Sequence, residues 1–130
     1  MSIALWCLFL AGLLHVLSKI PLAQAQLKSA GGYDNNNPRE QQIALEGWGK
    51  RALAAHQNQI ESFPLFAAGV IIATITGVES NIVDYCAIAY IVARLAYVYC
   101  YLKDVSTLRS IVWSVGLISS FALLCSPAWA

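Results

Sequence analysis

Charged side chains are scarce in this sequence of 130 residues. Asp, Glu, Lys and Arg make up 12% of the chain, whereas the apolar set AVILMFWYC makes up 58%. A soluble domain is about a quarter charged, so this chain lacks the charge that a water-exposed surface needs. The composition also excludes an intrinsically disordered chain, because such chains are poor in apolar residues. The sequence therefore predicts an integral membrane protein with a single domain over residues 1–130.

An excess of positive charge is also absent. Eight Lys and Arg residues against seven Asp and Glu residues leave a net charge of +1. Nucleic-acid binding needs a basic patch, so we expect no nucleic acid partner. Four cysteines stand singly, without a CxxC pair or a Cys/His cluster of zinc spacing, and we expect small buried hydrophobic side chains rather than a metal site. They are Cys7, Cys86, Cys100 and Cys125.

Uncharged segments long enough to cross a bilayer are abundant. Residues 1–18, 62–78 and 110–130 contain no Asp, Glu, Lys or Arg, and a fourth apolar stretch holds Arg94 near its middle. A helix needs about 20 residues to cross a hydrocarbon core, and lipid offers no partner for unpaired backbone groups. We therefore predict an all-α integral membrane four-helix bundle. The predicted spans cover about residues 2–22, 60–77, 82–102 and 107–126, with a cytoplasmic loop and helix extension over about 27–59.

The N-terminal apolar run allows two interpretations. The segment Leu22-Ala23-Gln24-Ala25 resembles the cleavage site of a secretory signal peptide. However, no Lys or Arg precedes the run, and the run is longer than the roughly 7–15 apolar residues of signal peptides. We therefore expect an uncleaved first transmembrane helix.

The Lys and Arg residues predict the orientation in the membrane. Five lie at or between the first two spans and two lie between the last two, whereas the second loop and both terminal flanks carry none. Cytoplasmic loops carry the excess of Lys and Arg. This rule places the first and third loops in the cytoplasm and both termini on the non-cytoplasmic side. The seven residues are Lys19, Lys28, Arg39, Lys50, Arg51, Lys103 and Arg109.

The polar stretch before the second span predicts a turn followed by a helix. Asn37 is a preferred N-cap residue, Pro38 suits the first helical position, and Glu40 completes a capping box. Since only Pro64 interrupts the segment from there to about Gly77, we expect one long helix that projects from the bilayer into the cytoplasm.

Small residues on that helix predict packing. Gly69, Ala73 and Gly77 recur every four residues and would let another helix approach closely. His15 stands alone on an apolar helix, where we expect a packed or lipid-edge side chain rather than a ligand.

Polar side chains in and beside the spans are the candidate functional residues. Asn58 and Glu61 share one helix face, Arg109 begins the fourth span, and three residues of the third span share a face. Ionisable groups at this depth are costly in lipid, so we expect them to converge in the cytoplasmic half of the bundle. They form either a ligand site or an internal Glu61–Arg94 ion pair with Asn58 and tyrosine hydroxyls as further partners. The three residues are Arg94, Tyr97 and Tyr101.

Two segments resemble a known family. Residues 51–66, RALAAHQNQIESFPLF, resemble the second-helix signature of the MAPEG superfamily, the membrane-associated proteins in eicosanoid and glutathione metabolism. Residues 93–102, ARLAYVYCYL, followed by LRS at 108–110, resemble its third helix and the start of its fourth. The loop YDNNNPR at residues 33–39 is similar to the bacterial branch.

The resemblance implies a homotrimer of four-helix subunits in the lipid bilayer of a bacterial inner membrane. Glutathione would bind as co-substrate between subunits on the cytoplasmic side, and no metal is implied. The implied activity is a glutathione-dependent transferase or peroxidase that acts on hydrophobic electrophiles or lipid hydroperoxides. The alternative is a non-catalytic lipid-binding or membrane assembly protein on the same scaffold.

The resemblance also implies roles for particular residues. Arg109 matches the arginine that stabilises the glutathione thiolate, which makes it the implied catalytic residue. Asn58 and Glu61 would hold the γ-glutamyl end. His56 matches a histidine of the microsomal transferase and prostaglandin synthase branches, and a solvated position at the helix edge is its alternative role. The implied glutathione-binding residues are Arg51, His56, Asn58, Glu61, Arg94, Tyr97 and Tyr101.

The chain departs from the family pattern at two positions. Ala54 stands where family enzymes carry an arginine four residues before the asparagine, and Arg51 is the nearest basic residue on that face. Ser62 stands where leukotriene-synthesising members carry a tyrosine. Lys19 and Lys28 are both candidates for the role of the family's helix-one arginine.

Overall fold

The computed structural model describes all 130 residues and contains helices but no strand. Its helices are α1 (Ile3–Leu17), α2 (Lys19–Leu27), α3 (Pro38–Ala44), α4 (Trp48–Ile75), α5 (Asn81–Leu102), α6 (Ser106–Leu124) and α7 (Ser126–Trp129).

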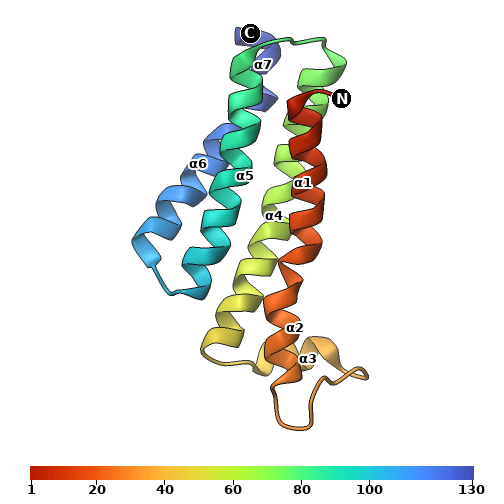
Figure 1. The fold of residues 1–130 in the computed structure, drawn as a ribbon, viewed down its shortest axis with the longest axis vertical. Helices are drawn as coiled ribbons and strands as arrows, with labels where there is room; N and C mark the ends of the chain where they lie inside the picture. Colours follow the sequence, from red (N-terminus) through yellow and green to blue (C-terminus); the bar gives the residue numbers. More distant parts are fainter.

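Four helical stretches are long and apolar enough to cross a membrane: α1 with α2, then α4, α5 and α6. Helices α1 and α2 count as one span of 25 residues, because Ser18 between them keeps a right-handed helical conformation. The predicted all-α fold with four transmembrane helices is therefore confirmed. Both termini lie at one end of the bundle, and the α2–α3 loop and the α5–α6 turn lie toward the other (Figure 1).

The prediction of one long helix that runs from Pro38 into the second span is wrong, because α3 and α4 are separate helices. Between them Gly47 has φ 55° and ψ −125°, a conformation that residues with a Cβ rarely adopt. The expected capping box is also absent, although α3 begins at Pro38. The backbone N–H of Asn37, which Glu40 would accept in a capping box, donates instead to Asp34 Oδ1 at 3.0 Å.

A network of glutamine side chains attaches α3 to α2. The fully buried Gln26 donates from Nε2 to the Pro38 carbonyl at 3.2 Å and to Gln41 Oε1 at 3.1 Å. Gln41 Nε2 donates in turn to the Gly32 carbonyl at 2.8 Å, and Gln42 Nε2 donates to Gln26 Oε1 at 3.4 Å. We call this network the glutamine clasp. It fixes the connecting loop by hydrogen bonds that satisfy buried amide groups.

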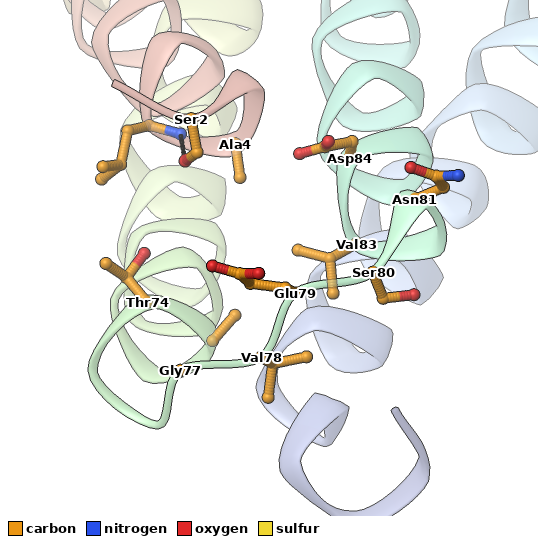
Figure 2. A pocket seen from close by; sticks show the side chains of 12 residues that line it. Ser2, Ala4, Thr74, Gly77, Val78, Glu79, Ser80, Asn81, Val83 and Asp84 are labelled. Carbon is orange, nitrogen blue, oxygen red and sulfur yellow. Dashed lines mark hydrogen bonds between the residues drawn. The ribbon is translucent and has the colours of Figure 1, made fainter.

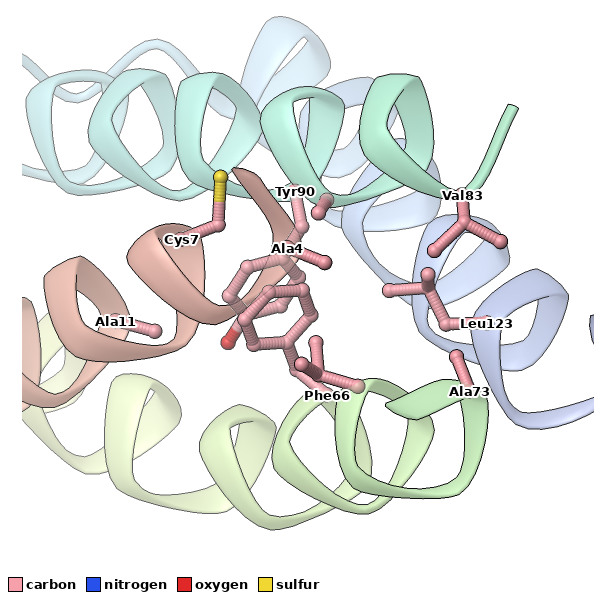
Figure 3. Packing of buried hydrophobic residues seen from close by; sticks show 10 residues of the cluster. Ala4, Cys7, Ala11, Phe66, Ala73, Val83, Tyr90 and Leu123 are labelled. Carbon is pink, nitrogen blue, oxygen red and sulfur yellow. The ribbon is translucent and has the colours of Figure 1, made fainter. Parts of the chain in front are cut away.

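The hydrophobic core lies where α1, α4, α5 and α6 meet (Figure 3). Alanines and a cysteine line the α1 side, while Phe66 and Tyr90 stack with ring centroids 3.8 Å apart and planes at 3°. Cys7 and Cys100 are buried as expected, but Cys125 is exposed. The core residues are Ala4, Cys7, Ala11, Phe66, Val70, Ala73, Val83, Ala87, Tyr90 and Leu123.

The small-residue pattern on α4 permits a close approach by α6 of the same chain. A Cβ added at Gly69 would lie 2.8 Å from Leu123 Cβ and 3.0 Å from the Ser120 carbonyl oxygen. Ala73 is buried in the core, but Gly77 takes no part, because it lies beyond the end of α4 with φ 67° and no atom near its missing Cβ. The approach therefore lies within a single chain.

Candidate functional site

Arg94, in the middle of α5, is buried with 1% of its surface exposed. Its Nε donates to Gln59 Oε1 at 2.7 Å, and a terminal guanidinium nitrogen donates to Asn58 Oδ1 at 2.9 Å. The guanidinium carbon lies 4.2 Å from the centroid of the Tyr97 ring. Glu61 is exposed and is not among these partners, so the internal Glu61–Arg94 ion pair is absent.

The charge of Arg94 is therefore held by neutral groups. Two amide oxygens accept hydrogen bonds from the guanidinium, and an aromatic ring lies against it. None of these groups carries a negative charge that would neutralise the guanidinium. A buried charge without a counter-charge is costly, and ionisable groups within membrane spans commonly mark ligand sites. The surroundings of Arg94 thus favour an anion.

A cavity of about 160 Å³ opens beside Arg94 between α4, α5 and α6. We call it the Arg94 cavity. Its wall combines a cation, a carboxylate, an amide, hydroxyls and apolar side chains. The lining residues are Asn58, Glu61, Ser62, Leu65, Arg94, Trp113, Leu117 and Ser120.

A second hollow of about 380 Å³ lies next to this cavity, with Trp113 in the walls of both. Tyr97 and Arg109 line it, and the Arg109 guanidinium carbon lies 4.5 Å from the centroid of the Tyr101 ring. Tyr101 packs edge-on against Tyr97 at 5.6 Å. We call this space the Arg109 hollow.

The structure thus brings together six of the residues predicted from the sequence. Asn58, Glu61 and Arg94 line the Arg94 cavity, while Tyr97, Tyr101 and Arg109 form one wall of the adjacent hollow or pack on it.

His56 and Arg51 lie elsewhere. His56 Nδ1 lies 2.8 Å from Ser18 Oγ, and its ring packs edge-on against His15, so His56 faces the first span. His15 also packs against Phe63, as expected for a packed side chain. Arg51 is half-buried and lines neither space, and its buried Nε has no hydrogen-bond partner in the chain.

Sequence reasoning missed four polar or aromatic residues of the site, which are Gln59, Ser62, Tyr90 and Trp113. Position offers a signal for three of them, because Tyr90 stands four residues before Arg94, Trp113 four after Arg109 and Ser62 four after Asn58. Residues four apart share a helix face. Gln59 offers no such signal, because it neighbours Asn58 in sequence and stands three or four positions from none of the six residues that the structure brings together.

The cavity at the opposite end of the bundle has a different character. It measures about 570 Å³ and lies between the start of α1, the end of α4 and the α4–α5 turn. Figure 2 shows Glu79 and Asp84 in its wall together with Ser2 and Thr74. No Lys or Arg lines it, so it offers no counter-charge to an anionic ligand.

Comparison with known proteins gives one match. The family model described as "MAPEG family" matches residues 3–129, a range that includes every helix. No curated protein and no solved structure matches the chain significantly.

Proposed function

The chain belongs to the MAPEG family, and we propose that it is a glutathione-dependent transferase or peroxidase acting on hydrophobic electrophiles or lipid hydroperoxides. Family membership and four membrane-spanning helices support a membrane-embedded, glutathione-related function. The observation that carries the proposal is the buried Arg94 guanidinium, which faces a cavity and has only neutral partners.

The charges of the site fit glutathione, which has two carboxylates, an ammonium group and a thiol. Arginine pairs well with carboxylates because its planar guanidinium donates two parallel hydrogen bonds. Arg94 offers such a partner within the Arg94 cavity, and the Glu61 carboxylate in the same wall suits an ammonium group. This combination fits the γ-glutamyl end, which bears a carboxylate and an ammonium on one carbon.

The Arg94 cavity alone is too small for glutathione. Pockets for small molecules measure roughly 300–1,000 Å³, whereas the Arg94 cavity measures about 160 Å³. A bound tripeptide therefore extends into the adjacent Arg109 hollow of about 380 Å³. In the proposed homotrimer a neighbouring copy covers these spaces, and Arg51, which lines neither of them in its own chain, reaches the ligand of that neighbour.

Arg109 supplies the chemistry in this proposal. A free thiol has a pKa of about 8.5, and a nearby cation favours the thiolate. In the Arg109 hollow the guanidinium would hold the glutathione sulfur as a thiolate. The thiolate forms a bond to the electrophilic carbon, and the leaving group departs with its electron pair. The hydrophobic second substrate reaches this hollow from the bilayer.

Charge placement supports a cytoplasmic site. Arg109 stands in the first turn of α6, toward the end of the bundle that carries the Lys- and Arg-rich loops (Figure 1). We place that end in the cytoplasm by the positive-inside rule. The host membrane in this proposal is the bacterial inner membrane.

Titration of glutathione into the detergent-solubilised protein, followed by calorimetry and thiolate absorbance across pH, tests the proposal. The parent should show thiolate below the pKa of free glutathione. Arg109→Ala should raise the pKa of the bound thiol and slow conjugation of a model electrophile by roughly tenfold or more, as the loss of a charge-assisted contact predicts. Its affinity for glutathione should fall less, because Arg94 and Glu61 still hold the peptide.

Two comparisons make the test decisive. Lys103→Ala is the matched control, because Lys103 is an exposed cation in the α5–α6 turn that lines neither space. Arg109→Lys behaving like the parent would mean that Arg109 only anchors α6 at the lipid headgroups, where Arg commonly reaches the interface. A parent without glutathione binding or thiolate would refute the enzyme and leave the non-catalytic lipid-binding or assembly role.

A further inference from the structure

The Ser62 hydroxyl is bonded differently from the hydroxyls of four other serines and threonines in the membrane-spanning helices. In these four residues the hydroxyl donates to the backbone carbonyl four positions earlier, at 2.8 to 3.2 Å. Their hydroxyl protons are therefore already used and are not available to a ligand. Ser62 has no such bond, and its Oγ lies 3.0 Å from the Tyr90 hydroxyl of α5. The four residues are Thr74, Ser110, Ser114 and Ser120.

The packing of its ring holds Tyr90 in place. Tyr90 is fully buried, and its ring stacks on Phe66 at 3.8 Å (Figure 3). Gly116 of α6 faces the same ring, since an added Cβ would lie in ordinary contact with it at 3.8 Å. Because stacking and burial hold the ring in place, they also fix the position of the hydroxyl oxygen, without help from a hydrogen bond.

The chemistry of the pair determines which hydroxyl donates. A phenol is more acidic than an aliphatic alcohol, so Tyr90 donates and Ser62 Oγ accepts. The Ser62 proton is then free, and an alcohol that accepts one hydrogen bond becomes a better donor in the next. Since Ser62 lines the Arg94 cavity, its free proton is available to a ligand beside the Arg94 guanidinium.

We propose that Ser62 donates a hydrogen bond to the α-carboxylate of the γ-glutamyl group, and that Tyr90 is a positioning residue that holds Ser62 in this role. The inference rests on the proposed function and deepens it by assigning the contents of the Arg94 cavity. The α-carboxylate is chosen because Ser62 and Arg94 share that wall with Glu61, which suits the neighbouring ammonium group. The sulfur lies away from them, in the Arg109 hollow.

Binding measurements with two ligands test the pair. One ligand is glutathione, and the other is 4-aminobutyryl-cysteinyl-glycine, which lacks only the α-carboxylate. Tyr90→Phe keeps the stacked ring and removes the hydroxyl. It should weaken glutathione binding roughly threefold to tenfold, as expected for one hydrogen bond, and leave the affinity for the second ligand unchanged. The KM for glutathione should rise by the same factor, with kcat and the pKa of the bound thiol unchanged.

A double-mutant cycle shows whether the two hydroxyls act together. Ser62→Ala should weaken glutathione binding as much as Tyr90→Phe, and the double variant should be no weaker than Ser62→Ala. Tyr99→Phe is the matched control, because Tyr99 lies on the same helix and is exposed. Thermal unfolding of each variant shows that the fold is retained.

The outcomes separate this inference from the proposed function. A parent that binds glutathione while Tyr90→Phe binds it equally well overturns the inference alone. Equal losses for both ligands also overturn it, because a structural disturbance does not depend on the α-carboxylate. A parent that binds neither ligand refutes the proposed function and this inference with it.

Discussion

Replacing Gly69 and Gly116 with alanine, one at a time, tests how α6 packs on its neighbours. Both glycines are buried in helices, where Gly→Ala stabilises a protein by about 0.4–1 kcal/mol if the new Cβ fits. At Gly69 the Cβ would lie 2.8 Å from Leu123 Cβ and 3.0 Å from a backbone carbonyl, so α6 would have to move. At Gly116 the nearest atom is Arg94 Cδ at 3.6 Å, an ordinary contact.

The two variants should therefore change stability in opposite directions. Overpacking costs about 1–3 kcal/mol, and the helix gain offsets part of it, which leaves Gly69→Ala destabilised by about 1–2 kcal/mol. Gly116→Ala should be neutral or stabilised by up to about 1 kcal/mol. Because 1 kcal/mol moves the midpoint of a domain of this size by roughly 4 °C, the two midpoints should be clearly separated.

Thermal unfolding in one detergent, followed by circular dichroism, measures the difference. The parent supplies the reference midpoint, and glutathione titration reports whether the Arg94 cavity is intact. A Gly69→Ala protein as stable as the parent would refute the close approach of α4 and α6. A Gly116→Ala protein that loses more than about 1 kcal/mol would refute the position of α6 over Arg94.

Three further changes test other parts of the molecule. A reporter fused after Ala130 should be active only on the non-cytoplasmic side, because the Lys and Arg residues lie in the first and third loops; activity in the cytoplasm would contradict the orientation. Gln41→Leu should detach α3 and speed hydrogen exchange and proteolysis there, with unchanged exchange arguing that Gln26 holds the loop without it. Arg94→Lys should weaken glutathione binding at least tenfold, because a single ammonium cannot replace a planar guanidinium; parent-like affinity would show that only the charge matters.

The membrane spans could be predicted from the sequence because lipid excludes charge, and three long segments contain none. The break before α4 could not be predicted in this way. Gly47 is compatible with a continuous helix as well as with the left-handed φ that it adopts, and contacts outside the segment decide between them. The glutamine clasp was missed for a similar reason, since Gln26 and Gln41 have no regular spacing.

Most residues of the candidate site could be predicted from the sequence, but the hydrogen-bond partners of each side chain could not. Helical spacing shows that Asn58 and Glu61 share a face, and that Arg94 and Tyr97 share another. It does not show how far each helix is rotated about its axis. That rotation turns Gln59, rather than Glu61, toward Arg94, and it turns His56 toward α1. The spacing of residues along one helix thus predicts which of them share a face. Which side chains form hydrogen bonds depends on how two neighbouring helices are rotated relative to each other.

The glutamine clasp has a consequence for the conditions under which the first loop stays attached. Its hydrogen bonds join amide groups only, from Gln26, Gln41 and Gln42 to one another and to backbone carbonyls. Dissolved ions screen charge pairs but have little effect on contacts between neutral dipoles. Amides also neither gain nor lose protons in the physiological range. A change in ionic strength or in acidity on that side of the membrane therefore leaves α3 in place.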